Sequence, residues 1–592
     1  MAAGRFAGLR NLTFLCLPAL YLPALYLAAL YLAAFALAAQ ATPHRAVESR
    51  HGMVVSSSEL ATGVGAKILG KGGNAIDAAV ATGFALAVTY PTAGNLGGGG
   101  FMVIHLADGT VVTNDHRETA PAGATQDMFL DDDGALIDGL STRSHLAAGV
   151  PGTVDGLLSV LARHGSLPRD VVLAPAIRLA QEGFALPADV ARDLARFADR
   201  FAAHPGSRQT FLRADGSPHE AGDHFRQPAL AATLVRIAEQ GRDGFYAGET
   251  ADLLVAEMAR GRGLISEQDL AAYRSVWREP VAGRYRGHDV YGMGPPSSGG
   301  ILIQQMLNML EPFDLNAKEY GSAAAVHLMV EVARRAYADR AMHLGDADFV
   351  EVPLVRLLDP AYARQRFADF KPERATASAA VGAGYWPEES ADTTHVSVMD
   401  ASGNAVSYTT TLNLAYGSKI VVEGAGFLLN NEMDDFSIKP GVPNAYGLIG
   451  GSANAIEPGK RMLSSMSPTI VSQDGRPWLV TGSPGGSTII TVTLQVLLNS
   501  IDHHMGVADA VARPRIHHQW WPDRIVHERW ALSPDTIALL RERGHPSLLR
   551  LPPGRGIGDA NSIVWRDELF YGKADPRGPG VAAGPTVIEP SN

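Results

Sequence analysis

The stretch SADTTHVSVMD (390–400) places two threonines at the start of a predicted strand in the middle of the chain. From Val396 onward apolar and polar residues alternate, which predicts a half-buried strand. Threonine favours strands, so β-propensity alone explains most Thr-Thr pairs. The alternative is that the chain is cut between Asp392 and Thr393. Thr393 would then carry both a hydroxyl nucleophile and a free α-amine that can serve as its base.

A turn and a second strand follow this segment. Residues 400–404 (DASGN) are typical turn residues, and AVSYTTTLN (405–413) returns as a strand. Folding symmetrically about Ser402 pairs Thr393 with Thr411, and the Cβ atoms of such pairs are about 4.5–5.5 Å apart. Unless a bulge shifts the pairing by one residue, the Thr411 hydroxyl is predicted to orient that of Thr393.

Further along the chain, loops rich in glycine and hydroxyl residues alternate with predicted strands. Loops of more than about 15 residues are usually lids, binding loops or disordered segments. Adjacent glycine N–H groups after a strand can form an oxyanion pocket. The segments are LLNNEMDDFS (428–437), the long loop 439–461, RMLSSMSPT (461–469) and WLVTGSPGGS (478–487).

The organisation of the chain predicts layered helices and sheets. Residues 57–69 and 74–88 are predicted helices, with Asn74 as a cap. GNLGGGGF (94–101) leads into a strand, and helical patterns dominate residues 150–370. Residues 371–392 form a polar, broken segment that we interpret as an exposed linker and a natural place for a cut.

Composition excludes several classes of function. The chain has 592 residues and a net charge of −11, which disfavours nucleic acid as a partner. The only cysteine is Cys16, so a chain processed after it has no disulfide and no thiolate chemistry. His219 and His224 have the wrong spacing for a zinc helix, and no metal site is predicted.

The N-terminus has the pattern of an export signal. Arg5 and Arg10 precede an apolar run over 12–39, and Ala39-Gln40-Ala41 resembles a cleavage site. The prediction is a signal peptide over 1–41 and a periplasmic or secreted protein. The apolar run is also long enough to span a bilayer, so an uncleaved anchor stays open.

Several motifs together resemble the γ-glutamyltranspeptidase family of N-terminal nucleophile hydrolases, over residues 50 to 580. They are HGMVVSSSELAT, GGNAIDAAVA, NLGGGGFM, DHRETAP, TTH, YTTTLN, LLNNEMDDFS, RMLSSMSPT and TGSPGGS. The resemblance implies an αββα sandwich, made as a precursor that cuts itself. The large subunit would be 42–392 and the small subunit 393–592. The chain departs from the family pattern at GKADPR (572–577), and at Glu432, where some relatives carry Gln.

The resemblance also implies roles for individual residues. Thr393 is the nucleophile, assisted by Thr411, and the oxyanion donors are Gly485 and Gly486. Tyr446 belongs to the lid, and cleavage falls at Asp392-Thr393. The implied substrate-binding residues are Arg117, Asn413, Glu432, Asp435, Ser464 and Ser465.

The activity implied is hydrolysis of γ-glutamyl amides such as glutathione, or transfer of the γ-glutamyl group to amino acids and peptides, without a cofactor. Arg117 suits the substrate carboxylate, because guanidinium and carboxylate form charge-assisted hydrogen bonds. Two alternatives stay open. One is a glutaryl-amide (cephalosporin-type) acylase of the same fold, and the other is an inactive, membrane-tethered binding protein.

Overall fold

The computed structural model of the protein describes residues 45–381, 393–439, 444, 448 and 450–586. The predicted signal peptide, Asp392 and Tyr446 lie outside the described residues. Within the described ranges, no helix is both long and apolar enough to cross a membrane.

The predicted hairpin forms the centre of the first sheet. β10 (Thr393–Asp400) pairs antiparallel with β11 (Ala405–Thr411), and one register holds from Thr393↔Thr411 to Met399↔Ala405. The predicted pairing of Thr393 with Thr411 is therefore confirmed, without a bulge. The strand order of this sheet is β19 (Val581–Ala583), β2 (Gly52–Ser56), β10, β11, β3 (Gly99–His105), β4 (Val111–His116) and β7 (Val276–Arg278).

A second sheet of seven strands faces the first. Its order is β1 (Val47–Ser49), β18 (Leu569–Lys573), β17 (Ser562–Arg566), β13 (Arg476–Thr481), β12 (Thr469–Gln473), β9 (His288–Gly292) and β8 (Val281–Tyr285). The interpretation of 150–370 as mainly helical is thus incomplete, because β7, β8 and β9 lie inside it. Strands of three to five residues are too short for alternation to stand out among long helical patterns.

The alternation along β10 explains how the layers stack. Val396 and Val398 pack into the core shared with the helices, whereas Met399 packs into the core between the two sheets. The inter-sheet core also includes Val480 and Ile563 of the second sheet. The prediction of a half-buried strand is wrong: β10 is buried at all its positions, because helices cover one of its faces and the second sheet covers the other.

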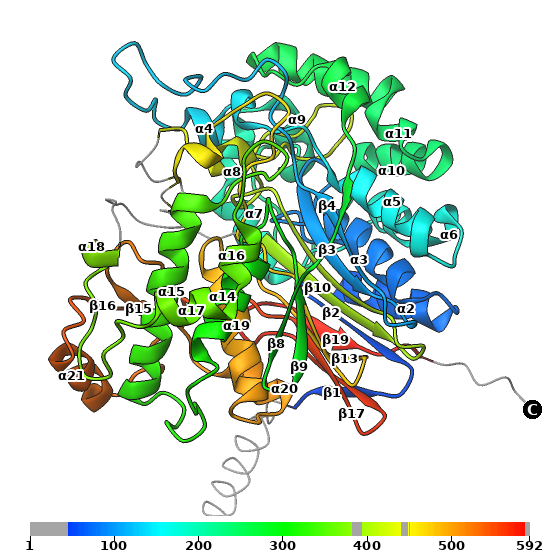
Figure 1. Ribbon diagram of the computed structural model, residues 1–592. Coiled ribbons are helices and arrows are strands. Elements are labelled where there is room, and N and C mark those ends of the chain that lie inside the picture. Colours follow the sequence, from blue (N-terminus) through cyan, green and yellow to red (C-terminus); the bar gives the residue numbers. More distant parts are fainter. Residues whose placement is uncertain (1–44, 382–392, 440–443, 445–447, 449, 587–592) are drawn as a thin grey trace, which may run out of the picture. The chain divides into compact units, whose positions relative to one another are not determined.

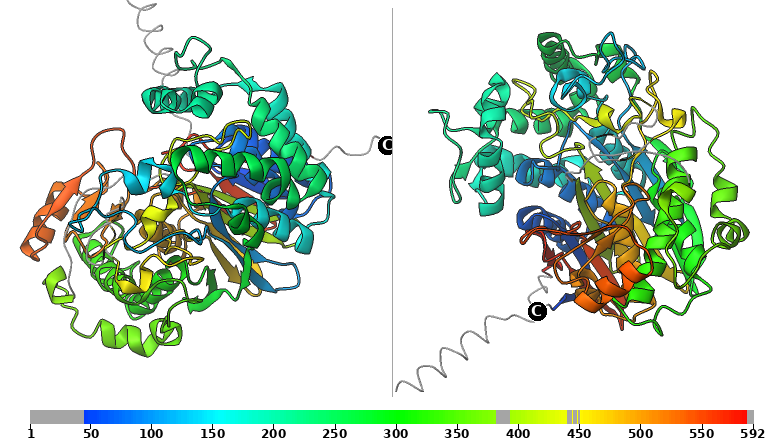
Figure 2. Two further views of the ribbon diagram at one scale, coloured as in Figure 1. Left: turned by 90° about the horizontal axis from the view of Figure 1, so that it is seen from above. Right: turned by 90° about the vertical axis from the view of Figure 1, so that its left-hand side faces the viewer.

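Helices cover the outer face of each sheet, which completes the predicted αββα sandwich (Figure 1). α2 (Glu59–Gly70) and α3 (Ala75–Thr89) pack on the first sheet, and α14 (Gly299–Leu310) and α19 (Thr488–Ile501) pack on the second. Figure 2 shows these layers from two further sides. Asn74 caps α3 as predicted, in a capping box with Asp77.

The other helices surround these layers. They are α4 (Leu140–Arg143), α5 (Thr153–His164), α6 (Arg169–Glu182), α7 (Ala188–Arg196), α8 (Ala198–Ala202), α9 (Pro205–Phe211), α10 (Pro228–Gln240), α11 (Asp243–Tyr246), α12 (Gly248–Gly261), α13 (Glu267–Ala272), α15 (Ala323–His343), α16 (Leu354–Leu358), α17 (Pro360–Arg366), α18 (Ser378–Val381), α20 (Val507–Ala512) and α21 (Pro534–Glu542). Short strands outside the two sheets are β5 (Phe184–Ala185), β6 (His224–Phe225), β14 (Ile516–His517), β15 (Ile525–His527) and β16 (Leu548–Arg550).

The predicted linker is exposed over residues 371–374, as expected, but it is anchored at Ser378. Ser378 is fully buried, its N–H donates to Asp523 (2.7 Å) and its hydroxyl donates to the Trp520 carbonyl (2.6 Å). The prediction of exposure is wrong at this one residue, because a small hydroxyl residue can be buried where its polar atoms find partners. Residues 382–392 lie outside the described residues.

Candidate active site

Four strand ends meet at the site, two from each sheet. β10 begins at Thr393 and β11 ends at Thr411 in the first sheet, while β12 begins at Thr469 and β13 ends at Thr481 in the second. The Ser407 hydroxyl ties these sheets together, since it donates to the Thr481 carbonyl (3.0 Å) and accepts from the Thr469 N–H (2.9 Å). The predicted motifs that precede β12 and follow β13 are brought beside Thr393 in this way.

A cavity opens between these strand ends. Its walls carry hydroxyls, two arginines and two acids together with a few apolar side chains. The lining residues are Arg117, Arg340, Thr393, Thr411, Asn413, Glu432, Asp435, Leu448, Ser464, Ser465, Met466, Gly486 and Ile489. Most of the side chains predicted from sequence therefore share one cavity.

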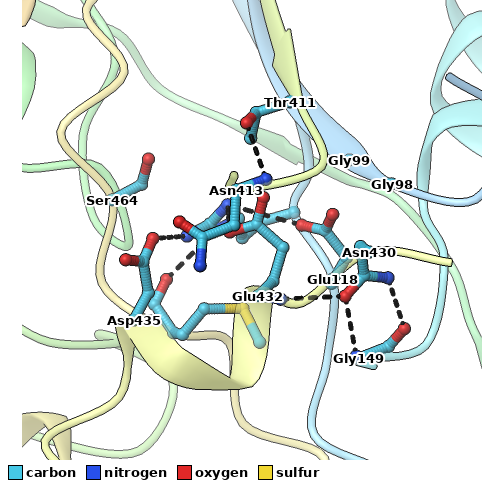
Figure 3. Close-up of polar contacts among 12 residues, drawn as sticks. Gly98, Gly99, Glu118, Gly149, Thr411, Asn413, Asn430, Glu432, Asp435 and Ser464 are labelled. Atoms are coloured by element: carbon cyan, nitrogen blue, oxygen red, sulfur yellow. Dashed lines mark hydrogen bonds and ion pairs between the residues drawn. The ribbon is translucent and has the colours of Figure 1, made fainter. Parts of the chain in front are cut away.

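Thr393 lies at the head of a short chain of hydrogen bonds. Its hydroxyl donates to the Thr411 hydroxyl at 3.4 Å, and the Thr411 oxygen also accepts the N–H of Asn413 (2.8 Å). Asn413 adopts φ = 77°, a left-handed conformation that Asn tolerates better than most residues. Figure 3 shows Thr411 and Asn413 near Asp435 and Ser464.

His395 does not serve Thr393 as a base. It is fully buried, and burial lowers its pKa to about 3. Nδ1 bonds the Thr409 hydroxyl (2.8 Å) and Nε2 bonds the Ser397 hydroxyl (3.1 Å), so both ring nitrogens are engaged within the two strands.

The glycine run at 97–100 lets β3 lie against the end of β11. A Cβ atom on Gly98 would stand 2.1 Å from the carbonyl oxygen of Thr411, and one on Gly99 would stand 2.5 Å from a carboxylate oxygen of Glu118. Real Cβ atoms do not approach other atoms so closely. The glycines thus make room for the Thr411 carbonyl and for the Glu118 carboxylate.

Arg117 is fully buried among three acids. Its guanidinium lies 2.6 Å from Glu432, 2.5 Å from Asp435 and 3.5 Å from Glu118. Burial alone would lower the pKa of Arg117, but the three carboxylates outweigh burial and raise it. Arg117 and Glu118 are therefore buried charges rather than solvated loop charges.

The same crowding acts on the acids. Burial raises the pKa of Glu118, Glu432 and Asp435, and the charge of Arg117 offsets this rise only in part. Three carboxylates next to one guanidinium repel one another, so this cluster retains protons to higher pH than free carboxyls do. A bound cation would favour the loss of those protons.

Asn430 fixes the position of the acidic turn. The turn is a 3₁₀ helix (Glu432–Asp435). The Asn430 amide donates to the carbonyls of Gly97 and Gly149 (both 2.8 Å), and its oxygen accepts the N–H of Gly149 (2.8 Å; Figure 3). The Asn430 oxygen also accepts the N–H of Glu432 (3.0 Å). The Asn430 side chain therefore fixes the start of the acidic turn, and with it the position of Glu432 next to Arg117.

Two further predicted groups complete the walls. Ser464 and Ser465 precede β12 and line the cavity, as does Gly486 after β13. Gly485 and Gly486 have φ of 137° and 53°, and their N–H groups donate to no acceptor in the described part of the chain. α19 begins two residues later, and the N-terminal end of a helix favours negative charge.

Sequence reasoning missed Arg340 and Asn430, and gave Glu118 no role. Arg340 comes from α15, and arginine in a helix is usually a solvated side chain, so no sequence signal marked it. For Tyr446 and Asp392 the structure gives no position. The predicted lid loop does reach the site at Asn444, whose amide donates to Asp435 (3.0 Å), and at Leu448.

Comparisons with known proteins agree with this geometry. The family model for gamma-glutamyltranspeptidase matches residues 61–585. The glutathione hydrolase proenzyme of Escherichia coli (strain K12) is 49% identical over 533 residues, which cover 90% of this chain and 91% of that protein.

Acylases are more distant relatives. The Acylase ACY 1 proenzyme of Pseudomonas sp. (strain SE83) is 40% identical over 524 residues, 87% of this chain and 90% of that protein. The crystal structure of cephalosporin acylase from Bacillus halodurans superposes with a TM-score of 0.79 at 28% identity, over 91% of this chain and 96% of that one. With a family model spanning most of its length, the chain belongs to the gamma-glutamyltranspeptidase family.

Proposed function

We propose that this protein is a γ-glutamyl hydrolase and transferase that acts through the hydroxyl of Thr393. One observation carries the proposal: a single cavity holds a threonine hydroxyl at a strand start, an arginine and two acids. The head of a γ-glutamyl group has one carboxylate and one ammonium. That cavity offers groups of the opposite charge to both.

Binding assigns the two charges of the substrate to different walls. Arg117 and the hydroxyls of Ser464 and Ser465 donate to the α-carboxylate, and Glu432, Asp435 and Asn413 accept from the α-ammonium. When the ammonium arrives, the acids that crowd Arg117 gain a second cation to share, which frees guanidinium donors for the carboxylate. The γ-carbonyl then points toward Thr393.

The chemistry follows in two half-reactions. The α-amine of Thr393 takes the hydroxyl proton as Oγ attacks the γ-amide carbon, and the N–H groups of Gly485 and Gly486 stabilise the oxyanion. The C–N bond breaks, the leaving amine takes the proton, and a γ-glutamyl ester remains on Thr393. Water or the amine of an amino acid then attacks the ester and restores the free hydroxyl.

The same hydroxyl generates its own base. In the precursor, Thr393 Oγ attacks the carbonyl carbon of Asp392, and the peptide bond becomes an ester as the nitrogen takes a proton. Water opens the ester, which leaves a free α-amine on Thr393 and a carboxylate on Asp392. A model α-amine has a pKa of about 7.7–8.0, which suits a general base near neutral pH.

Export is part of the proposal. The basic, then apolar N-terminus with its small-residue end is typical of a protein carried across a membrane. Fractionation of cells that make the full chain tests this. Finding the protein only in the cytoplasm would overturn it.

The acylase alternative differs in one charge. A glutaryl group has the carboxylate but no ammonium, so Glu432 and Asp435 would face a substrate without a cation. Two relatives are named acylases, which makes this the strongest rival.

Turnover of matched anilides separates the two. We expect kcat/KM for γ-glutamyl p-nitroanilide to exceed that for glutaryl p-nitroanilide at least a hundredfold. A preference for the glutaryl compound would identify an acylase. Turnover of neither, by a chain that stays intact, would favour an inactive binding protein.

A further inference from the structure

Arg340 is a second buried arginine of the cavity, and neither substrate binding nor the two half-reactions described for Thr393 uses it. It lies on α15, is 4% exposed and lines the cavity with Arg117. Its bonds differ from those of Arg117. Among the described residues no acid lies within ion-pair distance of Arg340, whereas Arg117 has three.

The contacts of Arg340 go to serine hydroxyls. Nε donates to Ser298 Oγ (3.0 Å) and Nη2 donates to Ser465 Oγ (3.3 Å). Ser298 connects Arg340 to Ser464, because its hydroxyl and its N–H both donate to the carbonyl of Ser464 (2.7 and 2.8 Å). One guanidinium therefore fixes the Ser464-Ser465 segment through its backbone and through one side chain.

The direction of these bonds determines what the two serine hydroxyls can do. A hydroxyl has one proton to donate and two lone pairs to accept with. Ser465 accepts from Arg340, and Ser464 accepts from the N–H of Met466 (3.1 Å). Each hydroxyl thus accepts from the protein and keeps its own proton for an acceptor in the cavity, which is the arrangement an anion requires.

Charge points the same way. Arg117 is surrounded by carboxylates, so its field in the cavity is largely cancelled. Burial lowers the pKa of Arg340 to about 10, because the charge of Asp435, which is not in ion-pair contact with it, offsets burial only in part; Arg340 stays charged at neutral pH. A buried cation without a carboxylate in contact is costly, and an anionic ligand is the group that would stabilise it.

We propose that Arg340 is a positioning and specificity-determining residue for the α-carboxylate of the γ-glutamyl group. It holds Ser464 and Ser465 with both hydroxyls available to donate, and it supplies positive charge at that end of the cavity. This inference rests on the proposed function. It predicts that the contribution of Arg340 vanishes for a substrate that lacks the carboxylate.

The test compares γ-glutamyl p-nitroanilide with 4-aminobutyryl p-nitroanilide, which keeps the ammonium and the amide but has no carboxylate. In Arg340→Gln we expect KM for the γ-glutamyl compound to rise at least tenfold while kcat changes less than threefold. The kcat/KM for the 4-aminobutyryl compound, measured at high enzyme concentration, should stay within twofold. Arg340→Lys keeps the charge but not the two-pronged donor, so it should recover part of the loss.

Two variants guard against misfolding. Ser298→Ala leaves the charge of Arg340 in place but cuts its link to Ser464, and should show a smaller effect, about threefold, on the γ-glutamyl compound alone. Arg335→Gln on the same helix removes an equally buried arginine that pairs with Glu331 (2.7 Å). It is expected to lower the amount of folded enzyme without changing the ratio between the two substrates.

An equal loss on both substrates in Arg340→Gln, or an unchanged KM for the γ-glutamyl compound, would overturn the inference. These results differ from failure of the proposed function, in which the wild-type enzyme itself does not turn over γ-glutamyl p-nitroanilide.

Discussion

The hydroxyls of Thr393 and Thr411 are 3.4 Å apart at the wall of the cavity. This is long for a bond between hydroxyls, and such bonds often shorten when a substrate excludes water. Thr411 also accepts from the Asn413 N–H, so its orientation is set by the backbone. We therefore expect the Thr411 hydroxyl to orient the Thr393 nucleophile.

Thr411→Ala removes that orienting bond and is expected to slow both self-cleavage and turnover about ten- to a hundredfold. A hydrogen bond in a desolvated site is worth about 1–3 kcal/mol, which gives this range. The measurement is kcat together with the rate at which the precursor disappears on a gel. Thr411→Ser keeps the hydroxyl and should retain most of both activities.

Thr410 provides the neighbouring control. Its hydroxyl donates to the Gly99 carbonyl (2.9 Å) and it does not line the cavity. Thr410→Ala should lower stability but change kcat less than threefold. If Thr410→Ala lowered kcat more than Thr411→Ala did, the assignment of Thr411 to orienting the Thr393 hydroxyl would be wrong.

Arg117→Lys tests recognition. Lysine keeps the charge but cannot bridge Glu432 and Asp435 with a planar fork, so kcat/KM should fall at least tenfold, about 1.4 kcal/mol. Self-cleavage involves no bound glutamyl group and should be nearly unchanged. Kinetics like those of the wild type would remove Arg117 from the substrate site.

The site residues that could be predicted from the sequence are those that lie in motifs, and there is a physical reason why Arg340 was missed. Thr393, Arg117, Glu432 and Ser464 lie in motifs whose order along the chain is specific. Arg340 lies in no such motif. Its importance comes from its position at the cavity without an acid in ion-pair contact among the described residues, and this is a property of the folded environment.

At the scale of elements, the close contact of β3 with β11 supports the site. Gly98 has no room for a side chain next to Thr411 and Asn95. The glycine run predicted that some part of the chain packs closely against it. It could not predict that this part is β11, because a glycine allows close packing without specifying the neighbour. The β10–β11 register, in contrast, followed from a symmetric turn, and the structure has that register.

Gly98→Ala is expected to push β3 away from the Thr411 carbonyl, which a Cβ atom would approach to 2.1 Å. We expect a loss of at least tenfold in kcat/KM and a lower Tm, measured by calorimetry. Gly63→Ala in α2 is the matched control, because a Cβ there meets nothing within 4 Å. It should leave activity unchanged and stabilise the helix by up to about 1 kcal/mol. Equal behaviour of the two variants would contradict the role of the glycine run.

At the scale of the whole molecule, the four layers bury many histidines. Burial lowers the pKa of five of them to about 3 or 4: His116, His395, His517, His518 and His545. These histidines stay neutral in the fold but take up protons in the unfolded chain below pH 6.5. Their contribution to stability is therefore present above about pH 6.5 and is lost as the pH falls toward 4.

His517→Gln should reduce this acid sensitivity. Between its unfolded and folded pKa values, each such histidine lowers the free energy of unfolding by about 1.4 kcal/mol for every unit by which the pH falls. In urea unfolding followed by tryptophan fluorescence, the variant should lose less stability between pH 6 and 4.5 than the wild type. Exposed His51 serves as the control, and His51→Gln should leave the slope unchanged. An unaltered slope in His517→Gln would mean that His517 is not neutral in the fold.

N-terminal sequencing of the purified protein shows whether Thr393 is the cleavage point, and the Thr393→Ala variant shows whether it is also the nucleophile. We expect two polypeptides on a denaturing gel, the smaller one starting at Thr393 and ending at residue 592. Thr393→Ala should remain a single chain without γ-glutamyl activity. A Thr393→Ala protein that still splits at this bond and turns over substrate, or a wild-type enzyme that is active as one intact chain, would contradict the account.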